Sequence, residues 1–584
     1  TQYPIPNTQY LTPDTSYPLI AEMRTNLTSP KNLIRPGAMV ITALGFALRL
    51  YTLASESLWY DELLQLDIAQ GPLPSMLPRL QGHAAVPLDY LIAHAWILLG
   101  RGEGWVRIPA VMFGTLALPV AYRLGRSLLG RYEGLLLMAL LALSPMHVRY
   151  SQEVRPYALV VLGVTLAGYA FWQMRRTGRW RYFILLQVGA VVITLAHVFG
   201  TAVFGPLLVL AAVDLAVGKD RKRAVKSMAG LLAAGFLSLM ILLSLGWGRY
   251  IVNNVTGFGG AVVEPEKFTV DPSQKPNLGS GPEVNGSFIK NEIVAPLGAG
   301  AASRSLWLFN GLAGLGLVYL LSRKQYRLGL LLILWLVLPV VSIVAFLVYR
   351  GTFFASRYII SILPAYLSLV VVGLLALFRW LKRIEFAWLS IGVALIIGAS
   401  LAGDLGASLN RLYHEQDKED WRLVGQFIAQ NAGPDDAVIA VNAEPTMNWY
   451  YPPAWAVPNR YETLESVQAA AAEARRSWVI LSLFSSDIDA SVKAWLGEGE
   501  QGAIRLVLDP EITVYYLGRN ATQEQLLEEI QGFALPVDHA LYASLARENR
   551  RRPAVARRYY QLAIEHAPTG ELRAEYRRAL DALP

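Results

Sequence analysis

The sequence predicts an α-helical integral membrane protein of about eleven transmembrane helices plus interfacial helices, followed by a small α/β domain and a helical tail. Three observations predict it. Only 16% of the 584 residues are charged and 54% are hydrophobic, whereas a soluble globular chain carries about 25% charged residues. Apolar runs of about 20 residues, the length that crosses a bilayer, recur as far as residue 406. Beyond residue 411, short apolar runs alternate with amphipathic helical patterns.

Residues 1–35 are expected to form a flexible cytoplasmic arm. The arm is rich in Pro, Thr, Tyr and Asn and has no apolar core of its own, so we expect it to order only against a partner protein. It lacks the basic, apolar and small-residue pattern of a cleaved signal peptide. The chain has no cysteine, which excludes disulfides, thiol catalysis and cysteine metal sites.

Basic residues fix the expected orientation of the spans. They cluster in five short loops, at 123–131, 175–181, 219–223, 323–327 and 379–383. The positive-inside rule places such loops in the cytoplasm, so the N-terminus lies inside and the C-terminal domain outside the cell membrane. The eleven expected spans are 36–54, 107–126, 134–150, 156–174, 181–198, 200–217, 227–247, 304–321, 328–348, 358–378 and 386–406.

The same alternation of inner and outer loops predicts two long outer loops within the transmembrane domain of residues 36–410. Residues 88–100 are apolar but too short to span comfortably, and counting them as a span would move the first basic loop outside. We therefore expect 55–106 to be one outer loop with re-entrant or interfacial helices. Residues 249–303, rich in Gly, Pro and Asn, form the second, and loops of this length are often functional.

The remaining chain is expected to divide into an extracytoplasmic α/β domain, 411–520, and a helical tail, 521–584. An amphipathic helix opens at about Asp417, and the helical patterns at about 463–475 and 486–496 alternate with strand-like runs. The tail has the spacing of one tetratricopeptide helix pair plus an extra helix, which cannot bury its own apolar face. We expect it to cap the α/β domain or to dock on a partner. The strand-like runs are 437–441, 478–484, 504–508 and 513–517.

Polar residues at the outer ends of the spans are the candidate functional residues. Asp61 and Glu62 follow the first span, and charges beside hydrocarbon usually mark function or access to solvent. The alternative is that the two carboxylates complement a helix N-terminus. His83 lies in the same loop, where a single histidine is often without a role. Arg107 stands at the entrance of the second span, where it holds either a lipid headgroup or a substrate.

Two further outer loops carry charge and aromatic residues. Glu153, Arg155 and Tyr157 lie between the third and fourth spans, and Arg357 and Tyr358 open the tenth. An outer arginine runs against the charge bias of the loops, so it either snorkels to headgroups or binds a phosphate. Carboxylates and arginines on one membrane face suit a reaction on a lipid-linked phosphate. A carboxylate takes a proton from an acceptor hydroxyl, and arginines stabilise the departing phosphate.

Five motifs resemble, in order and spacing, those of the GT-C glycosyltransferases, above all the protein O-mannosyltransferases and the aminoarabinose lipid A transferases. Residues 57–62, Ser-Leu-Trp-Tyr-Asp-Glu, resemble the Asp-Glu signature of their first outer loop, and 83–90 resemble a loosened His-Pro-Pro-Leu-Tyr-Tyr segment. The other three motifs are the Arg-x-Pro element within 104–109, the second-loop signature in 143–157, and Arg-Tyr at 357–358 followed by Pro364. The Trp-Trp-Asp-Tyr-Gly element of oligosaccharyltransferases is absent, which argues against transfer of a whole oligosaccharide to asparagine.

The resemblance implies a GT-C fold over about residues 36–410. It further implies an enzyme that moves a sugar, with inversion, from a polyprenyl-phosphate-linked donor to a protein, lipid or glycan acceptor outside the cytoplasmic membrane. By carry-over, Asp61 is the catalytic base or orients the acceptor, supported by Glu62 and Glu153. The residues implied in binding the lipid phosphate or the sugar are His83, Arg107, Arg155, Tyr157, Arg357 and Tyr358.

Several alternatives remain at this stage. A divalent metal ion held by Asp61, Glu62 and His83 is compatible with the residue types, but no spacing demands one. A transporter would place polar residues in mid-span and show repeated halves, which the sequence does not. A non-catalytic scaffold that keeps the fold would explain the same sequence. The expected partners are membrane lipids, the sugar donor, an acceptor and a protein bound by the arm or tail; the arginine runs at 550–552 and 557–558 are more typical of a solvated face than of a nucleic-acid site.

Overall fold

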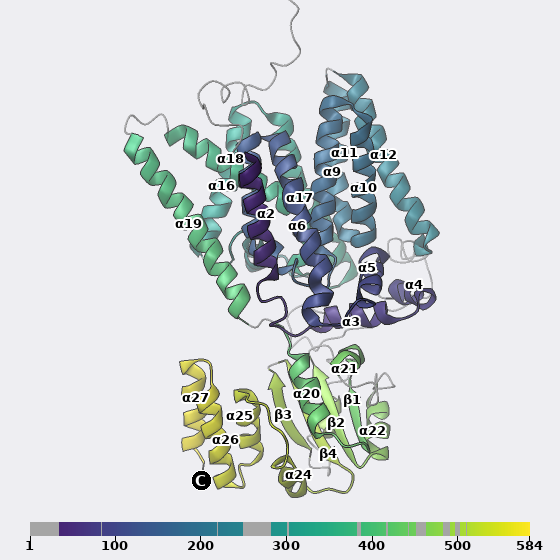
Figure 1. Cartoon of the computed structure of the whole chain (residues 1–584), viewed down its shortest axis with the longest axis vertical. Helices are drawn as coiled ribbons and strands as arrows, with labels where there is room; N and C mark the ends of the chain where they lie inside the picture. Colours follow the sequence, from purple (N-terminus) through teal and green to yellow (C-terminus); the bar gives the residue numbers. More distant parts are fainter. Residues whose placement is uncertain are drawn as a thin grey trace, which may run out of the picture.

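The computed structural model shows a bundle of helices standing on a smaller C-terminal unit that contains a β-sheet (Figure 1). The N-terminal arm, His83 and most of the second long loop lie outside the described residues. The structure describes residues 34–82, 85–218, 220–248, 282–300, 303–381, 387–415, 418–441, 443–450, 463–482, 491–496, 503–509 and 511–583.

Each of the eleven expected spans contains a helix of the bundle, which confirms the predicted fold class. By length and composition, eight helices of the described chain are able to cross a membrane. The other three expected spans contain α2, α7 and α10, which are 17, 13 and 17 residues long. The bundle helices are α2 (Ile34–Leu50), α6 (Glu103–Leu128), α7 (Arg131–Leu143), α9 (Tyr157–Thr177), α10 (Trp180–Ala196), α11 (Phe204–Val217), α12 (Arg221–Ser244), α16 (Ser303–Ser322), α17 (Tyr326–Arg350), α18 (Leu363–Leu381) and α19 (Ala387–His414).

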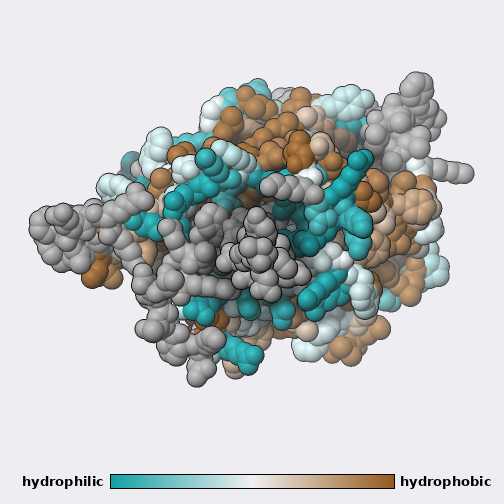
Figure 2. All heavy atoms as spheres, turned by 90° about the horizontal axis from the view of Figure 1, so that it is seen from above, coloured by the Kyte–Doolittle hydropathy of each residue, from teal (hydrophilic) through white to brown (hydrophobic). Residues whose placement is uncertain are grey.

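The sides of the bundle expose large apolar side chains, as a surface in lipid does. Phe236 on α12, Val341 on α17 and Leu395 on α19 are all more than half exposed. An apolar surface of this extent is rare in a soluble monomer. Figure 2, which looks onto the end of the bundle away from the C-terminal unit, shows polar side chains gathered on that end and apolar ones along its flanks. The structure therefore supports a multi-pass membrane protein.

Glycines allow helices inside the bundle to approach closely. A Cβ on Gly373 of α18 would collide with the main chain of α16 at Leu312, and one on Gly316 of α16 would collide with α18 at Leu369. Small residues at such contacts let helix backbones pack against each other where lipid provides no hydrophobic driving force. The pair fixes α18 in the bundle, and η3 (Ser356–Ile362), which carries Arg357 and Tyr358, directly precedes α18.

The described parts of the basic loops lie at the end of the bundle away from the C-terminal unit (Figure 1), and one acid ties three helices together there. Asp214 of α11 pairs with Arg175 of α9 and, at 3.1 Å, with Arg327 at the start of α17. Asp220 caps the neighbouring helix α12 by accepting a hydrogen bond from the backbone N–H of Arg223. The charges of the predicted basic loops thus share one end of the fold.

The opposite end of the bundle is covered by short helices, as expected for residues 55–106. Figure 1 shows α3, α4 and α5 lying across this end, directly above the C-terminal unit. The expected span 134–150 breaks at Ser144, whose hydroxyl accepts a hydrogen bond from the N–H of His147 and so starts a new helix. The short elements are α3 (Tyr60–Gln70), α4 (Leu73–Gly82), α5 (Pro87–Ile97), α8 (Pro145–Arg149), η1 (Val198–Val203), α14 (Gly286–Phe288), η2 (Ile289–Val294), α15 (Ala295–Leu297) and η3 (Ser356–Ile362).

The C-terminal unit holds a four-stranded sheet in the order β1-β2-β4-β3. The strands are β1 (Asp436–Ala440), β2 (Arg476–Ser482), β3 (Ile504–Asp509) and β4 (Ile512–Gly518). Strands β1 and β2 are parallel, and β4 pairs antiparallel with both β2 and β3. Every residue of β2 is buried, as the central position of that strand requires. The four strand-like runs of the sequence all form strands.

Helices cover the sheet and continue into the tail. The helix expected to open at Asp417 starts at Trp421 instead, because the side chain of Asp420 accepts a hydrogen bond from the N–H of Leu423 and caps it. The tail packs on the sheet, where Ser544 accepts a hydrogen bond from the N–H of Val507 at 3.2 Å. The domain limits themselves stay a prediction. The helices are α20 (Trp421–Asn431), α21 (Glu444–Tyr450), α22 (Leu464–Glu473), α24 (Gln523–Ile530), α25 (His539–Glu548), α26 (Pro553–His566) and α27 (Gly570–Asp581).

The C-terminal unit and the interfacial helices share one apolar core. Leu58, Leu63 and Leu66 of the first long loop belong to the same cluster of buried side chains as Trp421 and Met447 of the C-terminal unit. Burial of a large apolar side chain contributes about 1.5–3 kcal/mol. The helix that carries Asp61, α3, is therefore held by the C-terminal unit as well as by the bundle.

Candidate functional site

Asp61 lies between two arginines that reach it from distant parts of the chain. One oxygen of its carboxylate, Oδ2, is 3.1 Å from Nη2 of Arg357 and 3.6 Å from Nη2 of Arg155. Arg155 also donates a hydrogen bond to the backbone carbonyl of Asp61 at 3.3 Å. All three side chains are 16–18% exposed, so the cluster is largely shielded from solvent, and it carries a net charge of +1.

Each arginine keeps one buried donor without a partner. The Nε atoms of Arg155 and Arg357 are both buried and make no hydrogen bond in the described structure. A buried N–H that pairs with nothing costs about 1–3 kcal/mol. Two such donors beside a cluster of net positive charge favour an anion with several acceptor oxygens, and a phosphate group has this chemistry.

Aromatic rings form the wall of the site around the arginines. The guanidinium carbon of Arg357 is 5.1 Å from the ring centroid of Trp59 and 5.8 Å from that of Tyr358. His197 lies between Tyr157 and Tyr358, with ring centroids 5.5 Å and 6.0 Å away. Cation–π contacts of this kind contribute about 0.5–2 kcal/mol and hold an arginine in a fixed direction. The wall therefore orients the guanidinium group of Arg357.

Glu62, although adjacent to Asp61, points into a separate and fully paired network. The carboxylate of Glu62 is completely buried and binds Arg107 through two hydrogen bonds, of 2.9 and 2.7 Å. Burial raises the pKa of Glu62, but the attraction of Arg107 and Lys418 outweighs it and holds the pKa below its usual range. The other donors of Arg107 go to three backbone carbonyls of the preceding loop, those of Leu53, Glu56 and Ser57.

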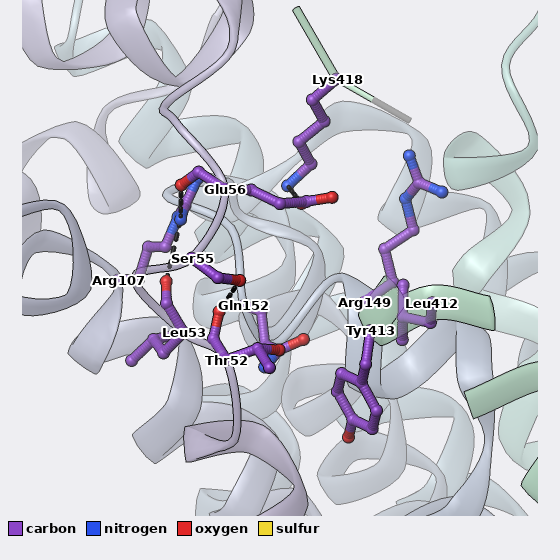
Figure 3. Close-up of a pocket in the computed structure, with 10 residues that line it drawn as sticks. All are labelled: Thr52, Leu53, Ser55, Glu56, Arg107, Arg149, Gln152, Leu412, Tyr413 and Lys418. Atoms are coloured by element: carbon purple, nitrogen blue, oxygen red, sulfur yellow. Dashed lines mark hydrogen bonds and ion pairs between the residues drawn. The ribbon is translucent and has the colours of Figure 1, made fainter. Parts of the chain in front are cut away.

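Glu153 belongs to another group of ion pairs, which includes Lys418 of the C-terminal unit. Its Oε1 atom is 3.2 Å from Nζ of Lys418 and 3.6 Å from Nε of Arg149, and its buried Oε2 atom makes no hydrogen bond. Lys418 also pairs with Glu56 at 3.6 Å. Figure 3 shows Lys418 and Arg149 among the residues that line a pocket. The pocket is lined by Thr52, Leu53, Ser55, Glu56, Arg107, Arg149, Gln152, Leu412, Tyr413 and Lys418.

Asp89 is a further buried acid close to the arginine cluster. It accepts a hydrogen bond from Nε2 of Gln65, and the amide oxygen of Gln65 is buried without a partner. Burial raises the pKa of Asp89 to about 6, more than the Gln65 hydrogen bond and Arg155 lower it.

This raised pKa predicts how stability depends on pH. Between pH 4 and 6 the folded protein keeps the proton of Asp89 while the unfolded chain loses it, so stability falls as the pH rises through that window, by at most roughly 3 kcal/mol. In Asp89→Asn this part of the fall should be absent from thermal unfolding midpoints measured between pH 4 and 8. Asp67→Asn, beside Arg79, is the control. An unchanged pH dependence in Asp89→Asn would contradict the assignment.

The structure brings together five of the residues that the sequence singles out: Asp61, Arg155, Tyr157, Arg357 and Tyr358. Glu62, Glu153 and Arg107 lie next to this cluster but pair within networks of their own, and His83 lies outside the described residues. Trp59, His197 and Lys418 were missed. Trp59 stands inside one of the five motifs and His197 interrupts an apolar stretch, so both left a signal, whereas Lys418 lies far along the chain from its partners Glu56 and Glu153.

A metal site gains no support from the described residues. Within them, no three His, Asp or Glu side chains are placed to hold a metal ion. Of the three proposed ligands, Glu62 is fully engaged with Arg107, and His83 falls in the undescribed segment. The metal therefore stays an open hypothesis of the sequence.

Comparisons with known proteins identify the class of this fold. Residues 83–247 match the family described as dolichyl-phosphate-mannose-protein mannosyltransferase. No curated protein sequence matches the chain. The structure is similar to ArnT from Cupriavidus metallidurans in the apo state, with 13% identity, a TM-score of 0.52, and coverage of 82% of this chain and 97% of ArnT. The same enzyme bound to undecaprenyl phosphate gives 14% identity, a TM-score of 0.51 and the same coverage.

An archaeal structure matches over a longer stretch of the chain. The oligosaccharyltransferase AglB from Archaeoglobus fulgidus, in complex with an inhibitory peptide and a dolichol-phosphate, is 11% identical with a TM-score of 0.53. The match covers 95% of this chain and 86% of AglB. These likenesses show the fold, which is that of the GT-C glycosyltransferases. The GT-C fold expected from the sequence motifs is thereby confirmed.

Proposed function

We propose that the protein is a membrane glycosyltransferase that moves a sugar from a polyprenyl-phosphate-linked donor to an acceptor, with inversion. One observation carries the proposal. Two partly buried arginines, Arg155 and Arg357, converge on Asp61 and leave two buried Nε donors free for an anion. The similar ArnT structure binds undecaprenyl phosphate and the AglB structure holds a dolichol-phosphate, which supports a lipid phosphate as that anion.

In the proposed reaction each residue has one task. The donor phosphate takes the free donors of Arg155 and Arg357, which neutralise the charge that grows on the phosphate as the bond to the sugar breaks. The carboxylate of Asp61 accepts the proton of the acceptor hydroxyl as its oxygen bonds to the anomeric carbon on the opposite face. The products are the glycosylated acceptor, polyprenyl phosphate and a protonated Asp61, which returns its proton to solvent. Glu62 and Arg107 serve as positioning residues that hold the loop.

The side of the membrane follows from the charges at the two ends of the bundle. The basic loops share the end away from Asp61, and the positive-inside rule assigns that end to the cytoplasm. We infer that the protein acts at the outer face of the cell membrane, with its C-terminal unit extracytoplasmic. The acceptor is a protein, lipid or glycan that approaches from that side.

The activity is tested on the full chain in lipid nanodiscs. Donors carrying mannose, glucose or aminoarabinose on polyprenyl phosphate are supplied with a total membrane extract as acceptor, and mass spectrometry follows released polyprenyl phosphate and sugar gained by acceptor. The proposal expects both products in equal amounts with at least one donor. No turnover with any of them, from folded protein, would favour the non-catalytic scaffold.

Arg357→Ala should weaken binding of the donor more than it lowers the rate at which the bound donor reacts. Removing one charge-assisted hydrogen bond to the phosphate costs about 1.5–3 kcal/mol, so we expect the donor KM to rise roughly 10- to 100-fold. Arg357→Lys should recover part of the loss because it keeps the charge but not the fixed fork. Arg223→Ala at the other end of the bundle is the control. An unchanged donor KM in Arg357→Ala would contradict the phosphate assignment.

A further inference from the structure

The segment just before α20 reaches out of the C-terminal unit and binds the start of α3. The carboxylate of Glu419 accepts a hydrogen bond from the backbone N–H of Tyr60 at 3.2 Å through its Oε2 atom, and the same atom accepts one from Nε1 of Trp421 at 2.9 Å. The backbone carbonyl of Glu419 accepts a further hydrogen bond from the hydroxyl of Ser57 at 2.8 Å. The side chain is 3% exposed.

This contact acts on the residue next to Asp61. Tyr60 is the first residue of α3 and Asp61 the second, and Trp59, before the helix, has no side-chain hydrogen bond that caps it. Glu419 therefore performs from another part of the chain the task of an N-terminal cap, with a negative charge at the positive end of the helix. A hydrogen bond to the first N–H of α3 fixes the direction in which the helix starts and so where the Asp61 side chain points.

Neighbouring contacts make the same connection at other points. The N–H of Leu58 donates to the hydroxyl of Tyr450 at 2.7 Å, and that hydroxyl donates to Glu103 at the start of α6 at 2.8 Å. Arg422 pairs with Glu103 at 3.0 Å and donates to the carbonyl of Ser55 at 2.6 Å. The C-terminal unit thus binds the first outer loop at Ser55, Leu58 and Tyr60, the segment that leads into Asp61.

We propose that Glu419 is a positioning residue for the glycosyl transfer, and that the C-terminal unit holds Asp61 in its working geometry through it. This inference rests on the proposed function. It assigns the C-terminal unit a part in the reaction itself, since without the Glu419 contact α3 would keep its packing and the Glu62–Arg107 pair but lose the hydrogen bond to its first N–H. Displacement of a reacting group by about 1 Å can cost 10²-fold in rate.

The charge of Glu419 gives the contact a signature in the pH profile. The charged groups that face it are Asp61 on α3 and Glu511 between β3 and β4, both negative; burial and these two charges raise the pKa of Glu419 to about 7, against the Trp421 and Tyr60 hydrogen bonds. The ionised form binds the helix start more strongly than the neutral form. The rate should therefore rise with pH through about 7 as Glu419 loses its proton.

The test compares two variants of the full chain in nanodiscs, with the polyprenyl-phosphate sugar that turns over fastest among the mannosyl, glucosyl and aminoarabinosyl donors. Glu419→Ala should lower kcat about 10- to 100-fold while the donor KM stays within about twofold, because Arg155 and Arg357 are untouched. Glu419→Gln keeps the hydrogen-bond acceptor without the charge, so it should lose less activity and lose the rise in kcat between pH 6 and 8. Asp538→Ala, which removes the cap of α25, is the control for simple destabilisation.

The outcomes separate this inference from the proposed function. Wild-type turnover with unchanged kcat in Glu419→Ala and an unchanged pH profile in Glu419→Gln would overturn the positioning role and leave the glycosyltransferase intact. A parallel loss in Asp538→Ala would overturn it too, since any weakening of the C-terminal unit would then suffice. Absence of turnover in the wild type would remove both proposals. If Glu419→Ala fails to fold, the pH profile of Glu419→Gln decides.

Discussion

Asp61→Asn is expected to lower the rate of sugar transfer by about 10²- to 10⁴-fold, the usual contribution of a general base. Asparagine keeps the size of the side chain but cannot accept the proton of the acceptor hydroxyl. The net charge of the cluster formed with Arg155 and Arg357 rises from +1 to +2, so donor phosphate should bind at least as tightly as before. The measurement is kcat together with direct binding of the donor in the same nanodiscs.

Two controls make this prediction specific to the base. Asp67→Asn removes a carboxylate from the same helix, at a position paired with Arg79 at 2.5 Å, and should leave kcat within about twofold. Asp61→Glu keeps the base but moves it by one methylene, and should retain part of the activity. Wild-type kcat in Asp61→Asn would show that another group accepts the proton.

Breaking the Glu62–Arg107 pair should have the largest effect on stability. Both side chains are almost fully buried and hold each other through two hydrogen bonds. Removing one partner of a buried pair leaves an uncompensated charge and costs about 3–5 kcal/mol. Arg107→Met should lower stability more than Glu62→Gln, because it also removes the hydrogen-bond donor of three backbone carbonyls. Thermal unfolding and the yield of folded protein are the measurements.

A partly exposed pair in the same chain supplies the comparison. Arg476 of β2 and Glu529 of α24 are 2.5 Å apart, with Glu529 34% exposed. Because water solvates the Glu529 carboxylate that remains, Arg476→Met should cost far less than Arg107→Met. Equal losses in the two variants would show that burial does not decide the strength of the Glu62–Arg107 pair.

The sequence was sufficient for the bundle because its signal is local. Apolar length predicts a span, and the alternation of basic loops predicts that Asp61 and Arg357 share one end although 296 positions separate them. Four short apolar runs likewise predicted the four strands of the C-terminal unit. The break at Ser144 and the start of α20 at Trp421 were missed because a single cap hydrogen bond decides each.

What the sequence could not give is the pairing of charged groups within one end. Asp61 and Glu62 are neighbours in the chain, yet one faces two arginines with free donors and the other closes a completed network with Arg107. Spacing along the chain cannot distinguish these environments, because consecutive side chains in the first turn of α3 point in different directions. The role of Glu419 was likewise invisible, since its contact with Tyr60 joins residues 359 positions apart.

The central claim is that a lipid phosphate binds between Arg155 and Arg357, facing Asp61. Electron cryomicroscopy of the full chain in nanodiscs loaded with polyprenyl phosphate tests it most directly. We predict density for the phosphate within hydrogen-bond distance of both Nε atoms, with the Asp61 carboxylate turned toward the open side. A phosphate bound instead at the Lys418 pocket or at the basic end of the bundle, with both Nε atoms still unpaired, would contradict it.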